Sequence, residues 1–330
     1  MVLSSAQSNQ PTRYRQRQTY NVYVMSDSSL IDRLIGAFLC CVVASLMLFN
    51  DSMAQTTDRR GLLWEVRKGK QVAWLLGTIH VGRPEFYPLP PSRLAQLKRA
   101  DAIVLEADIS DTPRAISATQ KYAMYADGAP GLETRLAPEL RQRIEAVLSR
   151  NQLDPAPMMR MKPWMLANVL ALFEAAQAGY MPALSVEAYL LRVAKTDNKQ
   201  VFEFEGIEQQ FELFEQAPWA TQVAFLEEAL KAVETRGARR ELNRIVQAWE
   251  TADRAALERL LVEMRAQSSV GSRFTVDTIL LGRHPKMVRK IETMMADGKS
   301  YLFAVGALHL IGPQGLVELL RARGYTLTEQ

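Results

Sequence analysis

The chain has 330 residues, of which 48% are hydrophobic and 23% charged, and its formal net charge is +4. This length and composition are those of a globular protein that buries a sizeable core, and they exclude a disordered chain. Basic and acidic residues are interspersed instead of forming a basic face with stacking aromatics, so we expect no nucleic-acid partner.

The N-terminal part of the chain has the pattern of a signal peptide spanning residues 1–54. Arg33 precedes an apolar run from Leu34 to Phe49, and Ser52-Met53-Ala54 supplies the small residues that a signal peptidase recognises. Cleavage is therefore expected after Ala54, which gives a secreted or periplasmic protein without a stable membrane span. The run is shorter than the roughly 20 residues of a spanning helix, so an inner-membrane anchor formed by Leu34–Phe49 is the weaker alternative. Translation from either Met1 or Met25 fits this pattern.

Both cysteines of the chain, Cys40 and Cys41, lie inside that apolar run. Cleavage would leave a mature chain without cysteine, which excludes disulfides, thiolate metal ligands and a cysteine nucleophile. The sequence also lacks Gly-x-Ser-x-Gly, His-Glu-x-x-His and Gly-x-Gly-x-x-Gly. Imidazole and carboxylate side chains remain as the candidates for a chemical site.

The mature chain begins with a predicted β-hairpin. Leu62–Val66 and Val72–Leu76 are apolar, β-favouring runs, and Gly69 between them supplies a turn. A loop rich in proline and glycine, Val81–Pro91, follows the second strand. Next come a short helix from Ser92 to Arg99 and a buried strand, Ala102–Leu105.

A largely helical region follows, roughly residues 113–265, and it is interrupted by one short strand. Its helices show apolar residues at three- and four-residue spacing, and several have proline in the first turn. The predicted helices are Pro113–Tyr125, Pro138–Arg150, Pro163–Ala178, Val186–Lys195, Glu208–Gln216, Trp219–Val233, Arg239–Trp249 and Arg254–Met264, and the strand is Gln200–Phe204.

The C-terminal part returns to alternating elements. We predict a helix over Pro285–Ala296, a strand over Tyr301–Val305, a helix over Pro313–Arg323 and a closing strand over Tyr325–Leu327. Strands near both ends with helices between them indicate a single α/β domain over residues 55–330. Its fold is a central mixed sheet, built from two pseudo-duplicated units, with a large helical insertion as a cap.

Those two units are strands that end in Gly-x-x-His. Val72–Leu76 leads into Gly77-Thr78-Ile79-His80, and Tyr301–Val305 leads into Gly306-Ala307-Leu308-His309. The chain contains only three histidines, so this repetition uses two of them. Glycine in each motif allows a sharp turn that returns the imidazole over the edge of the sheet.

Polar side chains follow four predicted strands, and ligands of open α/β sheets bind at the carboxyl ends of strands. The four side chains are His80, Glu106, Glu205 and His309. Two imidazoles and one or two carboxylates would suit a divalent metal, which is Zn, Mn or Co. The alternative for each histidine is a partly buried, hydrogen-bonded residue without a ligand, and Glu106 can equally be a capping or salt-bridged group. His284 precedes a proline at a helix start, so we interpret it as a cap or a surface residue, with metal ligation as the alternative.

Several motifs together resemble the TraB/GumN family, which is related to the Tiki metalloproteases. They span most of the chain from Leu62 to Leu327 and comprise Trp74-Leu75-Leu76-Gly77-Thr78-Ile79-His80, Val104-Leu105-Glu106, Lys162-Pro163-Trp164, Ala304-Val305-Gly306-Ala307-Leu308-His309-Leu310-Ile311-Gly312, Gly315-Leu316 and Gly324-Tyr325.

The resemblance implies a set of site residues. The family's motif histidines fall on His80 and His309, and its glutamate after the early strand falls on Glu106. Its arginine before the last helix, its glutamate after the middle strand and an acidic residue of the helical segment fall on Arg283, Glu205 and Glu187. The chain departs from the family at His284, where asparagine is common, and at Ser185, where glycine is common.

The sequence therefore supports the hypothesis of an exported, metal-dependent hydrolase that acts on a peptide or protein substrate. In this hypothesis His80 and His309 bind the metal, Glu106 is a ligand or the general base, and Arg283 stabilises negative charge on the tetrahedral intermediate. The alternatives are a periplasmic protein that binds or sequesters a metal or ligand without turnover, and a structural or interaction protein that uses the helices.

Overall fold

A computed structural model describes residues 59–330. The predicted signal peptide, its cleavage point and both cysteines lie outside the described residues. None of the helices in the described range combines the length and the apolar character that crossing a bilayer requires.

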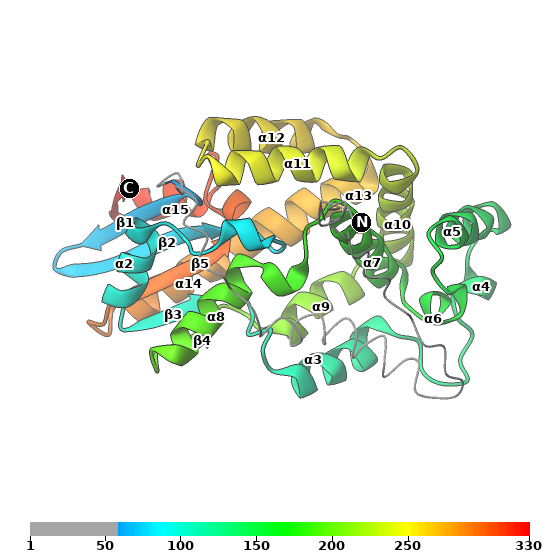
Figure 1. Ribbon diagram of the computed structural model, residues 1–330, viewed down its shortest axis with the longest axis horizontal. Coiled ribbons are helices and arrows are strands. Elements are labelled where there is room, and N and C mark those ends of the chain that lie inside the picture. The colour runs from blue at the N-terminus through cyan, green and yellow to red at the C-terminus, as the bar shows by residue number, and fades with distance from the viewer. Residues whose placement is uncertain (1–58) are drawn as a thin grey trace, which may run out of the picture.

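Six strands form one mixed sheet in the order β4-β3-β5-β2-β1-β6 (Figure 1). The four strands β4, β3, β5 and β2 are parallel, whereas β1 is antiparallel to both β2 and β6. The mixed α/β class predicted from the sequence is confirmed. The strands span Leu63–Lys68 (β1), Gln71–Thr78 (β2), Ala102–Leu105 (β3), Gln200–Glu203 (β4), Tyr301–Gly306 (β5) and Thr326–Glu329 (β6).

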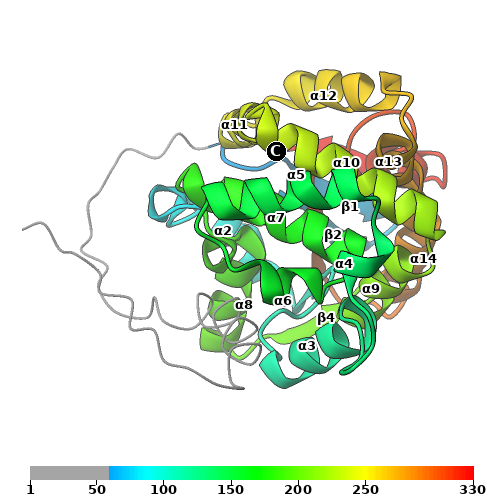
Figure 2. The same cartoon turned by 90° about the vertical axis from the view of Figure 1, so that its right-hand side faces the viewer.

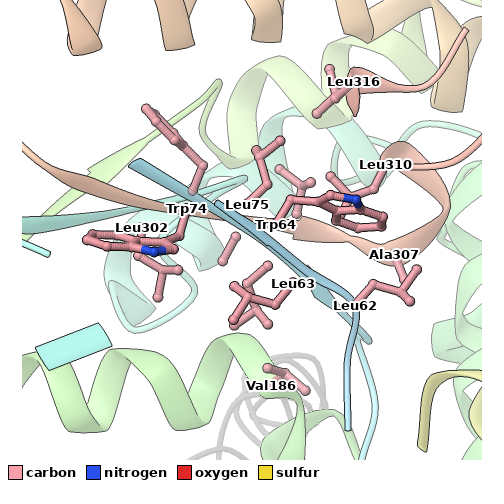
Figure 3. Close-up of a cluster of buried hydrophobic side chains, with 14 of the residues drawn as sticks. Leu62, Leu63, Trp64, Trp74, Leu75, Val186, Leu302, Ala307, Leu310 and Leu316 are labelled. Carbon is pink, nitrogen blue, oxygen red and sulfur yellow. The ribbon is translucent and has the colours of Figure 1, made fainter. Parts of the chain in front are cut away.

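The sheet is covered on both faces, as its apolar sequence requires. Every residue of β3 is buried, which is typical of parallel strands between helical layers. Side chains of the β1–β2 hairpin alternate between the two faces (Figure 3). Leu63 points to the side that carries Val186, and Trp64 points to the side that carries Leu310 and Leu316. The antiparallel hairpin pairs Leu63 with Leu76, and Gly69 at φ +60° lies in its turn.

Some of the helices between β3 and β5, namely α4, α5, α6, α7 and α10, build a second core away from the sheet. Figure 1 shows the sheet at one end of the molecule and α4, α5 and α6 at the other, and in Figure 2 α5, α7 and α10 lie on the side facing the viewer. Ile144 of α5, Leu166 of α7 and Leu226 of α10 are fully buried in this second cluster. This part of the insertion is packed by its own apolar residues, whereas α8, α11 and α12 add buried residues to the core of the sheet.

The helix bounds agree closely with the predicted ranges. The longer α-helices are Pro91–Arg99 (α2), Thr112–Ala118 (α3), Pro138–Arg150 (α5), Pro163–Gln177 (α7), Val186–Thr196 (α8), Ile207–Glu215 (α9), Trp219–Glu234 (α10), Gly237–Glu250 (α11), Arg254–Ala266 (α12), His284–Met295 (α14) and Leu316–Arg321 (α15). Shorter ones are Leu132–Arg135 (α4), Pro155–Met159 (α6) and Val270–Arg273 (α13).

The short helices α4, α6 and α13 were not predicted, and three further segments differ from the prediction. The helix expected over Pro113–Tyr125 is divided in two: α3 ends at Ala118, and a π-helical turn follows over Thr119–Ala123. At the junction the Thr119 hydroxyl donates to the Ala115 carbonyl at 2.8 Å. This contact is of the kind that bends helices. The last helix starts at Leu316 instead of Pro313, because Gly312 at φ +78° begins a turn. A further π-helical segment, Phe274–Leu280, precedes α14 and was absent from the prediction.

Candidate active site

The parallel strands bring the predicted site residues to one edge of the sheet. His80 follows β2, Glu106 follows β3, Glu205 follows β4 and His309 ends the short 3-10 helix after β5. Because the four strands are parallel neighbours, their carboxyl ends meet at this edge. Two residues that do not follow strands join the cluster: Glu187, which lies in the first turn of α8, and Arg283, which directly precedes α14.

Arg283 is the buried centre of this cluster. Its Nη2 donates to Glu106 Oε2 at 2.6 Å, and its Nε donates to Glu205 Oε2 at 2.9 Å. Its Nη1 donates to His309 Nε2 at 3.2 Å. The side chains of Arg283, Glu106 and Glu205 are 7%, 5% and 4% exposed, so one guanidinium compensates two buried carboxylates.

Glu106 is held as a carboxylate by its neighbours. Its Oε1 accepts from the Gly306 amide at 2.8 Å, and its Oε2 accepts from Arg283 and from Gln210 Nε2 at 3.3 Å. Burial acts to raise the pKa of Glu106, but His309, Arg283 and His80 in their charged forms and the Gly306 amide outweigh burial and lower it. Because burial lowers the pKa of His309 to about 3, Arg283 and protonated His80 are the positive charges that act on Glu106 at neutral pH.

His80 forms a carboxylate–imidazole pair with Glu187. Its Nδ1 lies 2.9 Å from Glu187 Oε1, which also accepts from the Thr78 hydroxyl at 2.5 Å. The Glu187 carboxylate raises the pKa of His80 to about 9, with a smaller contribution from Glu106, against the opposing effects of partial desolvation and Arg283. The His80 side chain is 64% exposed, so solvent screens part of this interaction. Glu187 Oε2 is buried and has no hydrogen-bond partner among residues 59–330.

His309 lies in the opposite environment. It is 5% exposed, and burial is the main cause that lowers its pKa, to about 3. Arg283 lowers this pKa further, because the guanidinium would repel a charged imidazole. His309 Nδ1 lies 2.9 Å from His284 Nε2, and His284 Nδ1 lies 2.6 Å from the Gln314 carbonyl oxygen. Burial likewise lowers the pKa of His284. The prediction of a surface or capping role for His284 is wrong, since the side chain is 1% exposed and belongs to the site.

Three of these groups converge on Gly306. A methyl group at this glycine would lie 3.4 Å from His80 Nε2, 3.5 Å from Glu106 Oε1 and 3.5 Å from His309 Cδ2. The Nε2 atoms of His80 and His309 lie 3.9 and 3.8 Å from the same oxygen, Glu106 Oε1. The space beside Gly306 is therefore bordered by both motif imidazoles and by Glu106, and a methyl group there would touch all three.

The donor set partly fits a divalent metal. Two imidazole Nε2 atoms and a carboxylate oxygen are ligands that Zn, Mn and Co accept. As arranged, however, no group of three or more His, Cys, Asp or Glu side chains within residues 59–330 is spaced to hold an ion. The His309 Nε2 lone pair accepts from Arg283, and metal coordination and this hydrogen bond exclude each other. The donors suit a metal only if Arg283 Nη1 releases His309.

Two larger hollows lie away from these side chains. One, of about 490 Å³, is lined by residues of α12 and by Leu310–Pro313, and the other, of about 470 Å³, lies between α9, α10 and the Phe274–Leu280 segment. Neither is lined by His80, Glu106 or Glu187. We place the candidate site by its chemistry, since a cluster of buried, charge-perturbed groups indicates function more directly than an empty surface hollow.

Sequence reasoning missed three contributors: Thr78, Gln210 and the Gly306 amide. Thr78 could have been noticed, because it lies inside the first Gly-x-x-His motif. Gln210 lies in an ordinary helical stretch, so no local signal distinguishes it. The role of His284 was hidden because its partners, His309 and the Gln314 carbonyl, are far from it in sequence.

Comparison with known proteins gives a family and distant relatives. The profile described as the TraB/PrgY/gumN family matches residues 62–329. The chain is 29% identical over 275 residues to the uncharacterized protein YbaP of Escherichia coli strain K12, covering 78% of this chain and 97% of YbaP, and the Shigella flexneri YbaP gives the same values. It is 23% identical over 305 residues to an uncharacterized protein of Treponema pallidum strain Nichols, covering 88% of each. No solved structure matches the chain.

Proposed function

The chain belongs to the TraB/PrgY/gumN family, and we propose that its strand-edge cluster is the active site of an exported, divalent-metal-dependent hydrolase that cleaves peptide bonds. One observation carries the proposal: the Nε2 atoms of His80 and His309 both lie within 4 Å of Glu106 Oε1, while each Nδ1 is engaged by another side chain. Metal-binding histidines usually have this arrangement, because the second nitrogen is held by a hydrogen-bond partner that orients the ring.

The charge of the cluster also favours a cation. Glu106, Glu187 and Glu205 are three carboxylates, whereas Arg283 is the permanent positive group among them. Protonated His80 offsets a further part of the negative charge in the metal-free protein. A divalent ion would displace the His80 proton and balance the carboxylates, so binding would be coupled to proton release.

His80, His309 and Glu106 would hold the metal. When bound, such an ion lowers the pKa of a coordinated water from about 15.7 to about 7 and so provides a nucleophile at neutral pH. Glu187 orients His80, and Thr78 orients Glu187. Arg283 remains tied to Glu205 through Nε, so its positive charge stays at the site when Nη1 leaves His309 and can stabilise an oxyanion.

A second function, metal or ligand binding without turnover, is favoured by the condition of Glu106. Both of its oxygens already accept hydrogen bonds, and its pKa is lowered. A carboxylate with a lowered pKa is a poor general base. It is still a good ligand for a cation, because Oε1 accepts one hydrogen bond and keeps a second lone pair. This alternative keeps the site and removes the catalytic step.

The test is metal content followed by peptide cleavage, using residues 55–330 purified without chelator. We expect about one equivalent of Zn, Mn or Co and cleavage of members of a peptide library, with both lost in His80→Ala and His309→Ala. Glu263→Gln, which removes an exposed pair with Arg244, serves as the control and should change neither. Metal without cleavage would favour the binding protein, and unchanged metal content and cleavage in both histidine variants would overturn the assignment.

A further inference from the structure

The structure assigns His284 a positioning role: it fixes the tautomer of His309, so that the His309 Nε2 lone pair faces the site. The inference deepens the proposed function, because that lone pair is the one offered to a metal. His284 touches none of the proposed ligands except His309, so we treat it as a positioning residue and not as a ligand.

Three contacts connect Arg283, the two imidazoles of His309 and His284, and the Gln314 carbonyl in one series. Arg283 Nη1 lies 3.2 Å from His309 Nε2, His309 Nδ1 lies 2.9 Å from His284 Nε2, and His284 Nδ1 lies 2.6 Å from the Gln314 carbonyl oxygen. Both imidazoles are buried, at 5% and 1% exposure, so water does not replace these partners. Each nitrogen of the two rings therefore has one partner in the protein.

Arg283 and the Gln314 carbonyl, the groups at the two ends of this hydrogen-bonded series, determine where the protons lie. A guanidinium only donates and a carbonyl oxygen only accepts. His309 Nε2 must then accept from Arg283, which leaves the proton of a neutral ring on Nδ1. His284 Nε2 must accept that proton's hydrogen bond, and His284 Nδ1 must donate to the Gln314 carbonyl. One arrangement of protons satisfies all three contacts, with both rings neutral and both carrying hydrogen on Nδ1.

Other arrangements leave a conflict at a buried contact. A proton on His309 Nε2 would face the N–H of Arg283, donor against donor. A proton on His284 Nε2 would likewise face the Nδ1–H of His309, donor against donor. If His284 were neutral with its proton on Nε2, the Gln314 carbonyl would also lose its donor. Leaving a buried polar group unpaired is costly, so the contacts select a single tautomer of each ring.

The two motif histidines are thus oriented by different partners. His80 has an exposed ring and a carboxylate behind it, Glu187, which favours its protonated form. His309 has a buried ring and a neutral imidazole behind it, which accepts a hydrogen bond without adding negative charge. His284 therefore keeps a metal-ready lone pair on His309 in the metal-free protein, and it remains hydrogen-bonded to Nδ1 when Arg283 releases Nε2.

The first test reads the tautomers directly. Metal-free residues 55–330 labelled with ¹⁵N-histidine, at pH 7.5, would be examined by long-range ¹H–¹⁵N NMR, with the three rings assigned from His80→Gln and His309→Gln. We expect hydrogen on Nδ1 in both His284 and His309, and a nitrogen–nitrogen coupling across the hydrogen bond between them. Hydrogen on Nε2 of either ring would overturn the inference, whatever the protein does with metals or peptides.

The second test measures Zn²⁺ affinity by calorimetry in two matched variants. His284→Gln keeps an acceptor oxygen near the position of Nε2, whereas His284→Leu removes it. We expect a loss of about 10–100-fold in affinity for the leucine variant, as is typical when the hydrogen-bond partner of a ligand is removed, and a smaller loss for glutamine. His284→Met replaces the leucine variant if that does not fold. Equal Zn²⁺ affinities in the apolar and glutamine variants would refute the positioning role.

Failure of the proposed function is distinguishable from failure of this inference. If the unaltered protein binds no Zn²⁺, Mn²⁺ or Co²⁺, the metal site fails, and the NMR result alone then decides the tautomer of His309. If the metal binds but peptides are not cleaved, the affinities of the two variants still decide the role of His284.

Discussion

Gly306→Ala should leave the protein folded and block its site. The backbone at Gly306, with φ −49° and ψ 135°, is accessible to alanine, and the amide that donates to Glu106 is retained. The new methyl group would have its nearest neighbours at 3.4 to 3.5 Å, which are ordinary van der Waals distances. Folding stability should therefore be unchanged or rise by about 0.4–1 kcal/mol, because alanine restricts the unfolded chain.

The same methyl group occupies the space on which the functional groups converge. It lies within 3.5 Å of His80 Nε2 and Glu106 Oε1, whereas an ion bound to both needs bonds of roughly 2.0–2.2 Å to each. Ion and methyl group therefore compete for one volume, and the ligands must shift to admit the ion. A displacement of about 1 Å in such a site costs on the order of 10²-fold in turnover.

Urea unfolding, metal calorimetry and peptide cleavage measured on one preparation separate these effects, and Gly77→Ala is the matched control. At Gly77 the methyl group would meet atoms of Ala307 and Leu310 at 3.1 to 3.3 Å, away from the imidazoles. Overpacking there should cost about 1–3 kcal/mol of stability. Undiminished metal binding and turnover in Gly306→Ala, or a stability loss as large as that of Gly77→Ala, would refute our account of the site.

Three further predictions follow from the charges of the cluster. Glu187→Gln should return the pKa of His80 from about 9 toward its ordinary value near 6.5, as followed by NMR titration. Because the pKa is raised in the folded protein, the stability that this pair contributes is present below about pH 6.5 and is lost as the pH rises through about 9. This pH-dependent contribution should disappear in the variant. Arg283→Met should destabilise the fold by about 3–5 kcal/mol in urea unfolding, since it leaves two buried carboxylates without their cation, and a loss below 1 kcal/mol would contradict the pairing. Burial lowers the pKa of His309 to about 3 and also lowers that of His284, so stability should be full above about pH 6.5 and fall as the pH decreases toward 3, with a smaller fall in His284→Gln.

Most of the fold could be predicted because its signals are local. The strand at Ala102–Leu105 is a short apolar run, and the helix at Pro138–Arg150 has both a first-turn proline and a helical period, so both were predicted with their observed bounds. The segment from Phe274 to Leu280 was missed, because a π-helical segment has the same residue types as an α-helix and differs in its hydrogen bonding. Register and strand order depend on long-range pairing, which one sequence does not display.

The residues of the site could be predicted from the sequence where they directly follow a predicted strand. His80, Glu106, Glu205 and His309 each follow an apolar strand, and parallel strands bring such residues together without further information. Arg283 and Glu187 came only from the family resemblance, because they enter from helices and no local pattern marks them. The two motif histidines differ in burial: the His80 side chain is 64% exposed and the His309 side chain is 6% exposed. The identical Gly-x-x-His motifs did not indicate this difference.

This difference between the two histidines follows from how each strand ends. After β2 the chain continues without helix or strand through His80, which stands at the surface, where Glu187 raises its pKa. After β5 the chain turns at once into a 3-10 helix, which carries His309 inward against Arg283 and His284. The site thus has one imidazole that is protonated at neutral pH and one that is not. Metal binding would require a proton to leave the first and a guanidinium to leave the second, so a rise in pH should strengthen binding through His80 alone.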